Sequence, residues 1–334
     1  MLTIHLMAPP CFNLFYVTGG YKVVYVGFDI GGTFVKYGLV AENGTILNKG
    51  HMPTSHKLEQ LLADIEAIVQ NYAAERQITA IGVSAPGIIK QDGFMVTGGA
   101  LRELYQVNLK QLIEDKTGYN TTVENDANAA AIAEQWLGNA QGIANYLTIV
   151  LGTGVGGGIV INGDIYRGTH GMAGEFGFTL TRDFNETVDK NIEIASQNFS
   201  SSVSKGLLET YNRAEKQAGY PEKQTDDARA IIERTQAGEP VSCRVFDTYV
   251  KHIAVNLVNL IGTFDPEVIL IGGGISNSTF FIEQVQQKVL ALLQQHGSLA
   301  PLVGKTTATV LPTKLRNDAG IIGAVFQAIK QGKH

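Results

Sequence analysis

Three polar residues stand where a strand pattern runs into a helix pattern. Glu124, Asn125 and Asp126 follow the β-branched run Thr121–Val123 and precede an alanine-rich segment that ends near Trp136. A carboxylate at such a junction can serve as a general base. It can equally cap the helix, because Asn and Asp are preferred N-cap residues and an acid complements the helix dipole. On this stretch alone capping is the stronger interpretation, and catalysis is the alternative.

Three glycine-rich turns each follow an apolar strand pattern. They are Asp29–Thr33 (DIGGT), Leu151–Gly158 (LGTGVGGG) and Ile271–Ser276 (IGGGIS). Phosphate binding needs backbone N–H groups close to the anion, and side chains obstruct that approach. No turn carries the Walker lysine, and the second runs into a strand rather than the helix of a dinucleotide fingerprint. One such turn could be a simple hairpin. Three together favour a nucleotide held between two hairpins, with its base near the third.

Asp29 ends a buried strand beside Gly31 and Gly32. A buried carboxylate is costly unless it is paired, and Mg²⁺ with its waters is a natural partner beside a triphosphate. A hydrogen bond from Asp29 to its own turn is the alternative.

The segments that position these turns follow one plan twice. From Val23 the sequence predicts a strand, a glycine turn, a strand, a turn at Asn43-Gly44 and a third strand. The same order returns from Tyr146, with Asn162-Gly163 at the second turn. Two copies of this meander predict two related domains that face each other. Hydrophobic spacing adds helices over 55–75, 109–116, 241–264, 280–295 and 318–330, and strands over 78–84 and 308–312. Residues 268–276 are predicted to form a buried strand that enters its glycine turn.

Composition narrows the class of protein. The chain has 334 residues, 44% hydrophobic and 17% charged, with a net charge of −5, so nothing favours nucleic acid or an anionic membrane as a partner. Its two cysteines, Cys11 and Cys243, are too few for a disulfide framework, and we expect a cytoplasmic protein. Residues 1–22 lack a basic start and contain Pro9-Pro10, which predicts a poorly ordered extension rather than a signal peptide.

The motifs DIGGT, ENDAN, LGTGVGGG and GMAGEFG, in this order and spacing, resemble those of the ROK family (repressors, open reading frames and kinases). This family belongs to the actin-like ATPases, which include hexokinases. The resemblance runs from about Val23 to the last helix. It implies an α/β fold with two ribonuclease-H-like domains around a cleft. We expect an N-terminal domain of residues 23–126 plus 318–334 and a C-terminal domain of residues 127–317.

The resemblance also implies ATP-dependent transfer of phosphate to a sugar hydroxyl, usually on C6. Asp126 matches the family's catalytic base, so we expect it both to cap the helix and to accept the hydroxyl proton, staying ionised at the helix N-terminus. The implied sugar-binding residues are Asn125, Glu175, Glu193, Gly87, Gly98 and Gly99. The implied ATP-binding residues are Asp29, Gly31, Gly32, Thr33, Thr153, Gly154, Gly273 and Ser276, with Mg²⁺ on Asp29 through water.

The chain departs from the family pattern after the Gly-Glu motif. Many members carry a histidine and then a cysteine cluster that binds zinc. Here the histidine position is Phe178, and the following stretch to Ser196 has no cysteine, so we expect no zinc site. Phe178 offers an apolar ring where the histidine contacts the sugar near its anomeric end, which favours a sugar that carries an aglycone. We therefore expect a β-glucoside kinase, for example one acting on cellobiose, with glucokinase or another hexose or N-acylhexosamine kinase as the alternative.

Other classes of function fit less well. A DNA-binding repressor of this family would need a helix-turn-helix segment before Val23, and residues 1–22 lack its periodicity and charge. A non-catalytic sugar sensor stays a less favoured alternative, because Asp126, Asp29 and Thr153 are all present. An oxidoreductase would need a helix after the glycines. A homodimer is common in the family, and the sequence pattern does not decide it.

Overall fold

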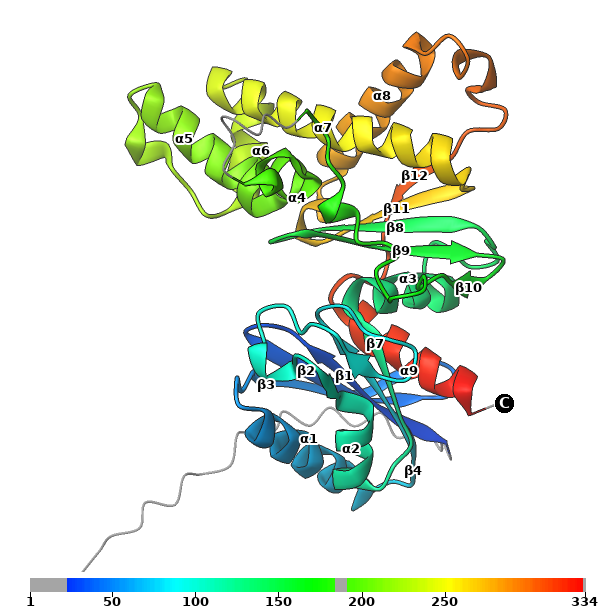
Figure 1. Ribbon diagram of the computed structural model, residues 1–334. Coiled ribbons are helices and arrows are strands. Elements are labelled where there is room, and N and C mark those ends of the chain that lie inside the picture. The colour runs from blue at the N-terminus through cyan, green and yellow to red at the C-terminus, as the bar shows by residue number, and fades with distance from the viewer. Residues whose placement is uncertain (1–22, 184–190, 333–334) are drawn as a thin grey trace, which may run out of the picture.

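Residues 23–183 and 191–332 are described by a computed structural model of the chain. The predicted extension, residues 1–22, lies outside the described residues. Figure 1 shows two lobes, each built on one sheet, with helices on the outer faces and two helices between the sheets. Within the described residues, no helix combines the length and the apolar composition that crossing a membrane requires.

The two main sheets have the same topology. The first contains β1 (Val24–Ile30), β2 (Phe34–Ala41), β3 (Ile46–Pro53), β4 (Ile78–Ala85) and β7 (Thr121–Asn125), in the order β3-β2-β1-β4-β7. The second contains β8 (Tyr146–Leu151), β9 (Val155–Ile161), β10 (Asp164–Ile165), β11 (Val268–Gly272) and β12 (Thr309–Pro312), in the order β10-β9-β8-β11-β12. In each sheet three antiparallel strands are followed by two parallel ones. The predicted α/β fold with two ribonuclease-H-like units is confirmed.

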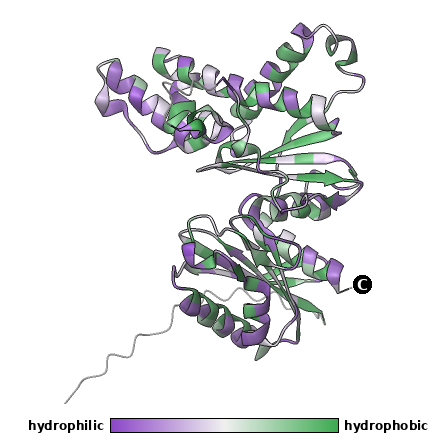
Figure 2. Ribbon diagram, in the orientation of Figure 1, coloured by the Kyte–Doolittle hydropathy of each residue, from purple (hydrophilic) through white to green (hydrophobic). Residues whose placement is uncertain are grey.

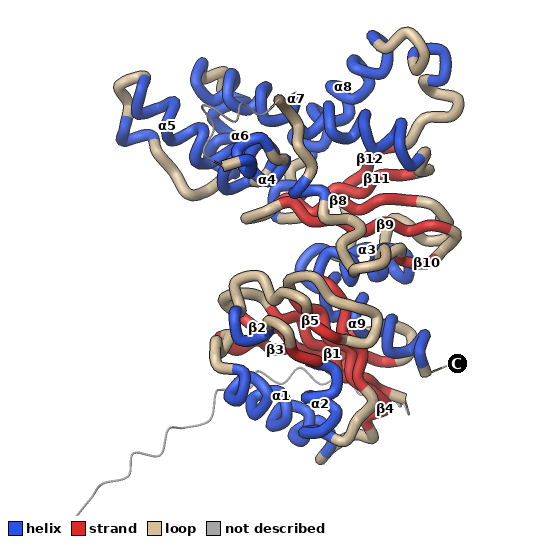
Figure 3. Tube along the Cα trace, in the orientation of Figure 1, coloured by secondary structure: helices blue, strands red, loops and turns tan. Residues whose placement is uncertain are grey.

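Helices α3 (Asp126–Leu137) and α9 (Ala319–Gln331) form the layer between the sheets. Helix α9 packs on β1 and β4 of the first sheet, α3 packs on β8 and β9 of the second, and the two helices pack on each other. The outer helices, visible in Figure 3, are α1 (Leu58–Ala73) and α2 (Leu109–Thr117) on the first sheet, and α4 (Gln197–Ser201), α5 (Thr210–Gln217), α6 (Ala228–Gln236), α7 (Pro240–Phe264) and α8 (Thr279–Gln295) in the second lobe. Because α9 and α3 pack on each other as well as on their own sheets, this packing does not mark a boundary between the lobes. The domain bounds at 126 and 318 therefore stay a proposal.

Each lobe has its own apolar core, because strands buried on both faces need cover from helices. In Figure 2 the strands of both sheets are mostly hydrophobic, whereas the outer helices also carry hydrophilic residues. The close fit of α9 depends on glycine: a Cβ on Gly82 of β4 would lie 2.2 Å from the carbonyl oxygen of Ala324. A side chain there would push the last helix off the first sheet.

The two Asn-Gly turns differ in detail. Asn162 and Gly163 both have positive φ, as a two-residue hairpin turn requires. In the first copy only Gly44 is left-handed, and its N–H donates to the Ala41 carbonyl in a longer turn. The helical segment that begins at Gln197 is interrupted at Ser202. Ser202 is extended, and its side chain accepts from the Lys205 N–H at the start of the helical turn Val203–Glu209.

Candidate active site

The junction of β7 and α3 is capped by Asn125. Its Oδ1 accepts hydrogen bonds from the N–H groups of Ala127 (2.9 Å) and Asn128 (3.1 Å). The expectation that Asp126 itself caps the helix is therefore wrong, because Asp126 is the first helical residue. The Asn125 Nδ2 donates to the Gly87 carbonyl (2.9 Å). An amide nitrogen has two hydrogens, so one N–H remains for a ligand.

Asp126 extends from the first turn of α3, and its Oδ1 accepts from the Ala127 N–H (2.8 Å). Asp126 lines a cavity and is open to solvent there, while protein atoms crowd around its carboxylate. This burial raises the pKa of Asp126 to about 6, and the charge of Asp29 adds to the rise, while the Ala127 N–H opposes it. Cavity water screens part of the effect, and a bound ligand would remove that screening. Desolvation of the Asp126 carboxylate thus outweighs the stabilisation that the helix N-terminus gives to its charge, and the pKa rises.

A cavity of ≈ 360 Å³ brings together residues from both lobes. Its lining includes Gly87, Gly99, Asn125, Asp126, Glu175 and Phe178. Burial raises the pKa of Glu175, and the nearby charge of Asp126 raises it further. Two carboxylates beside an amide and backbone groups provide the donors and acceptors that a polyhydroxylated ligand needs.

Two predicted sugar-binding residues do not line this cavity. Glu193 is exposed in the short helix Ile192–Ala195, where its Oε2 accepts from the Asn191 side chain (3.3 Å). Gly98 packs against backbone, since a Cβ there would lie 2.6 Å from the Leu101 carbonyl oxygen. Their contact with a sugar stays a prediction, and the cavity gives it no support.

Side chains of neighbouring strands and loops hold the first glycine turn by hydrogen bonds. Asp29 Oδ1 accepts from the Ser84 hydroxyl (3.1 Å), and its Oδ2 lies 3.3 Å from the Lys36 Nζ. Thr54 Oγ1 donates to the Gly31 carbonyl (2.7 Å), while Gly32 and Thr33 are exposed at the tip. Sequence analysis missed Lys36. The hairpin register could have found it, because β1 and β2 pair Asp29 directly with Lys36 across the turn.

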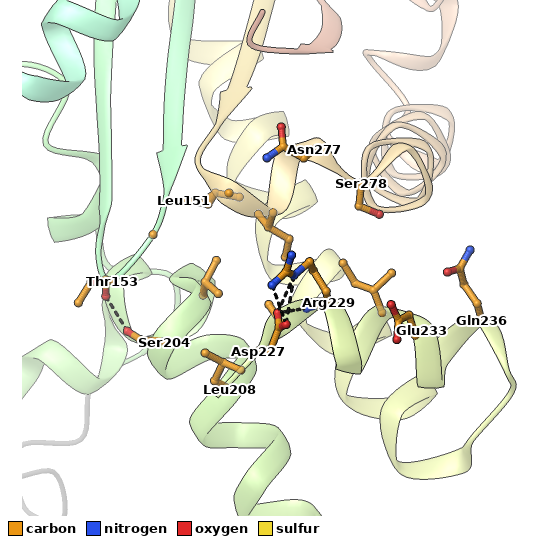
Figure 4. Close-up of a pocket in the computed structure, with 16 residues that line it drawn as sticks. Leu151, Thr153, Ser204, Leu208, Asp227, Arg229, Glu233, Gln236, Asn277 and Ser278 are labelled. Atoms are coloured by element: carbon orange, nitrogen blue, oxygen red, sulfur yellow. Dashed lines mark hydrogen bonds and ion pairs between the residues drawn. The ribbon is translucent and has the colours of Figure 1, made fainter. Parts of the chain in front are cut away.

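The second and third turns meet in the other lobe. A Cβ on Gly273 would lie 2.0 Å from the Leu151 carbonyl oxygen, so only glycine allows this approach. Beside the two turns lies a cavity of ≈ 740 Å³, shown in Figure 4. Thr153 lines it, and the Ser204 hydroxyl donates to the Thr153 carbonyl (2.7 Å). Gly154 is exposed in the second turn, and the Val155 N–H behind it donates to the Asn198 side chain (2.7 Å).

The predicted residues of the third turn do not themselves line this larger cavity. Ser276 is buried and donates to the Gly273 carbonyl (2.8 Å), whereas the lining residues from this turn are Gly274, Ile275, Asn277 and Ser278. Sequence analysis also missed that the α6 region lines one side of the larger cavity, with Asp227, Ala228, Arg229, Ile232, Glu233 and Gln236. Asp227 and Arg229 form an ion pair at its edge (Figure 4). Helical spacing alone could not show which face of α6 meets the glycine turns.

A metal at this site would depend on very few protein ligands. Within residues 23–183 and 191–332, no three or more His, Cys, Asp or Glu side chains gather closely enough to hold an ion by themselves. Asp29 and Asp126 are close enough for their charges to interact. Mg²⁺ commonly takes one or two carboxylates and completes its shell with phosphate oxygens and water. The pair fits that pattern.

Comparisons with known proteins agree with this geometry. A sequence model of the ROK family matches residues 25–331. A beta-glucoside kinase from Listeria innocua is 31% identical over 306 residues, covering 91% of this chain and 97% of that protein. A glucokinase from Halalkalibacterium halodurans is 29% identical, covering 90% and 93%. A solved ROK family glucokinase from Streptomyces griseus, in complex with glucose and AMPPNP, has a TM-score of 0.76 and 27% identity, covering 92% and 99%.

Proposed function

This chain belongs to the ROK family and is an ATP-dependent sugar kinase, and we propose that it phosphorylates β-glucosides on the C6 hydroxyl. The observation that carries the choice of substrate is Phe178. Phe178 lines the cavity that holds Asp126 and Glu175, and the residue is 55% exposed. An exposed aromatic ring in a polar cavity suits a ligand that is a sugar at one end and bulkier at the other.

Two neighbours extend this apolar surface. Leu180 is 50% exposed and follows Phe178 by two residues, just after the short helix Phe176–Phe178. Ile192, 49% exposed, begins the short helix Ile192–Ala195, and the Thr181 N–H donates to the last carbonyl of that helix. Large exposed apolar residues grouped beside a ligand cavity commonly mark a binding surface. The name of the Listeria innocua relative supports the same substrate class.

The proposed reaction needs little covalent chemistry from the protein. The sugar hydroxyl oxygen attacks the γ-phosphorus of ATP, the bond to the ADP oxygen breaks, and Asp126 accepts the hydroxyl proton. Glu175 accepts hydrogen bonds from other sugar hydroxyls, and the free N–H of Asn125 donates one. The backbone N–H groups of the exposed glycine turns face the phosphates, and the larger cavity takes the adenosine.

We further propose that Asp29 holds Mg²⁺, through water, beside the phosphates. The ion would neutralise charge on the transferred group. Asp29 keeps free lone pairs for this, because Ser84 and Lys36 each occupy only one direction of its carboxylate.

A substrate panel tests the proposal. Initial rates with ATP are measured for cellobiose, an aryl β-glucoside, glucose, fructose and N-acetylmannosamine. We expect the β-glucosides to have the highest kcat/KM, and Phe178→His to shift the preference towards free glucose. Phe178→Leu is the matched control, because it keeps an apolar surface and should keep the β-glucoside preference. A strong wild-type preference for free glucose over cellobiose would rule out the β-glucoside assignment.

The second candidate is a hexose kinase. The glucokinases of Halalkalibacterium halodurans and Streptomyces griseus match over nearly the whole chain, which favours glucose as the alternative acceptor. The same panel separates the two candidates.

A further inference from the structure

An ion pair between buried Glu124 and partly buried Arg167 joins the two lobes. Glu124, in β7, is 3% exposed, and its Oε2 accepts from Arg167 Nε (2.9 Å) and Nη2. Arg167 lies just after β10, at the edge of the second sheet. Neither residue is among those that line the cavity containing Asp126. The pair therefore lies outside the lining of that cavity.

The other oxygen of Glu124 fixes the junction that presents Asp126. Glu124 Oε1 accepts from the backbone N–H of Asn125 (3.1 Å) and from the side chain of Asn128 (3.0 Å). Asn128 is itself buried and lies in the first turn of α3. One carboxylate thus holds both the last residue of the strand and the first turn of the helix.

Arg167 anchors the loop that ends at Glu175. The Arg167 carbonyl accepts from the Ala173 N–H (3.2 Å), which closes the loop between them. A Cβ on Gly171 in this loop would lie 2.6 Å from the Ile89 carbonyl oxygen, so the loop packs against the first lobe. The chain then enters Gly174 and Glu175. Arg167 is therefore bound to Glu124 at the start of this loop. Glu175, the second carboxylate of the cavity, follows the end of the same loop.

We propose that Glu124 and Arg167 are positioning residues that set the separation of Asp126 and Glu175 across the cavity. Stability alone is a poor reason for such a pair, because desolvation offsets much of its attraction. A guanidinium that donates from both Nε and Nη2 instead fixes direction as well as distance, which an ammonium cannot do. Since substrate hydroxyls must meet both carboxylates at once, small errors in their separation weaken sugar binding more than ATP binding. This inference rests on the roles proposed for Asp126 and Glu175.

The test uses Glu124→Gln and Arg167→Lys with the sugar that gives the best turnover in the panel. We expect KM for the sugar, and its Kd measured calorimetrically without ATP, to rise about tenfold or more, while KM for ATP changes less than about twofold. Glu134→Gln is the matched control. Glu134 is a fully buried carboxylate at the far end of α3 that accepts from the N–H groups of Asn139, Lys314 and Leu315. Its loss should lower the melting temperature without raising the sugar KM.

The outcomes separate positioning from simple stabilisation. If both variants lower only the melting temperature or the amount of folded protein, as Glu134→Gln should, and the sugar KM stays at the wild-type value, the inference is overturned. Arg167→Lys keeps the positive charge beside Glu124, so it remains informative if Glu124→Gln fails to fold. The proposed base is tested independently by Asp126→Asn. If Asp126→Asn is inactive while the sugar KM is unchanged in both Glu124→Gln and Arg167→Lys, the positioning role is rejected and the base assignment is kept.

Discussion

The raised pKa of Asp126 predicts an acid limb in the activity of the enzyme near neutral pH. Burial and the charge of Asp29 raise the pKa from 3.8 to about 6. The base must be ionised to accept the hydroxyl proton, so activity is present above this pKa and is lost as the pH falls through it. A one-proton titration at about 6 leaves the group about 90% ionised at pH 7 and about 10% at pH 5. We therefore expect kcat/KM for the sugar to fall about tenfold over that interval.

The assay should measure the sugar phosphate directly, by mass spectrometry at saturating ATP, because coupling enzymes have pH profiles of their own. Bound phosphates near Asp126 oppose ionisation of the base and move the limb to higher pH, whereas Mg²⁺ moves it to lower pH, so the Mg²⁺ and ATP concentrations are held constant across the profile. Asp126→Asn provides the control. Its Oδ1 can still accept from the Ala127 N–H, so the fold and sugar binding should survive. Turnover should fall by about 10²–10⁴-fold, the usual contribution of a general base.

Three results would refute this reasoning. A wild-type profile that is flat between pH 5 and pH 7 would place the pKa of the base near its ordinary value. An Asp126→Asn enzyme with near-normal turnover would show that another group accepts the proton. A residual rate in Asp126→Asn that keeps the same acid limb would assign the limb to ATP or to another residue.

Two further predictions address the metal and the fold. Asp29→Asn should raise the Mg²⁺ concentration needed for half-maximal rate, because the variant lacks the carboxylate proposed to hold the ion. A Mg²⁺ titration of the rate that matches wild type would contradict the metal role. Gly82→Ala should lower the free energy of unfolding by about 1–3 kcal/mol or more, because its Cβ would meet the Ala324 carbonyl oxygen at 2.2 Å. Its control is Gly262→Ala in helix α7, where an added Cβ would have nothing within 4 Å. This substitution should be neutral or stabilise the protein by up to about 1 kcal/mol. Equal melting temperatures for the two variants would show that α9 tolerates displacement.

Local patterns in the sequence were enough for most of the fold. The strand that ends at Asn125, the helix after it and the three glycine turns follow from β-branched runs, helical spacing and turn chemistry within a few residues. The repeated meander predicted two like sheets, and both have the same strand order. The hairpin register even contained the Asp29–Lys36 pair, although sequence analysis did not use it.

The sequence by itself therefore determined the fold class, the family motifs and the place of Asp126 at a strand-to-helix junction, because short-range geometry governs each of them. Only the tertiary structure decided that Asn125 caps α3, that burial outweighs the helix N-terminus at Asp126, and that Glu193 stays outside the cavity. It also decided that Arg167 meets Glu124 and that α6 walls the larger cavity. Desolvation and contacts between distant segments depend on how whole elements pack, and no local pattern records that packing.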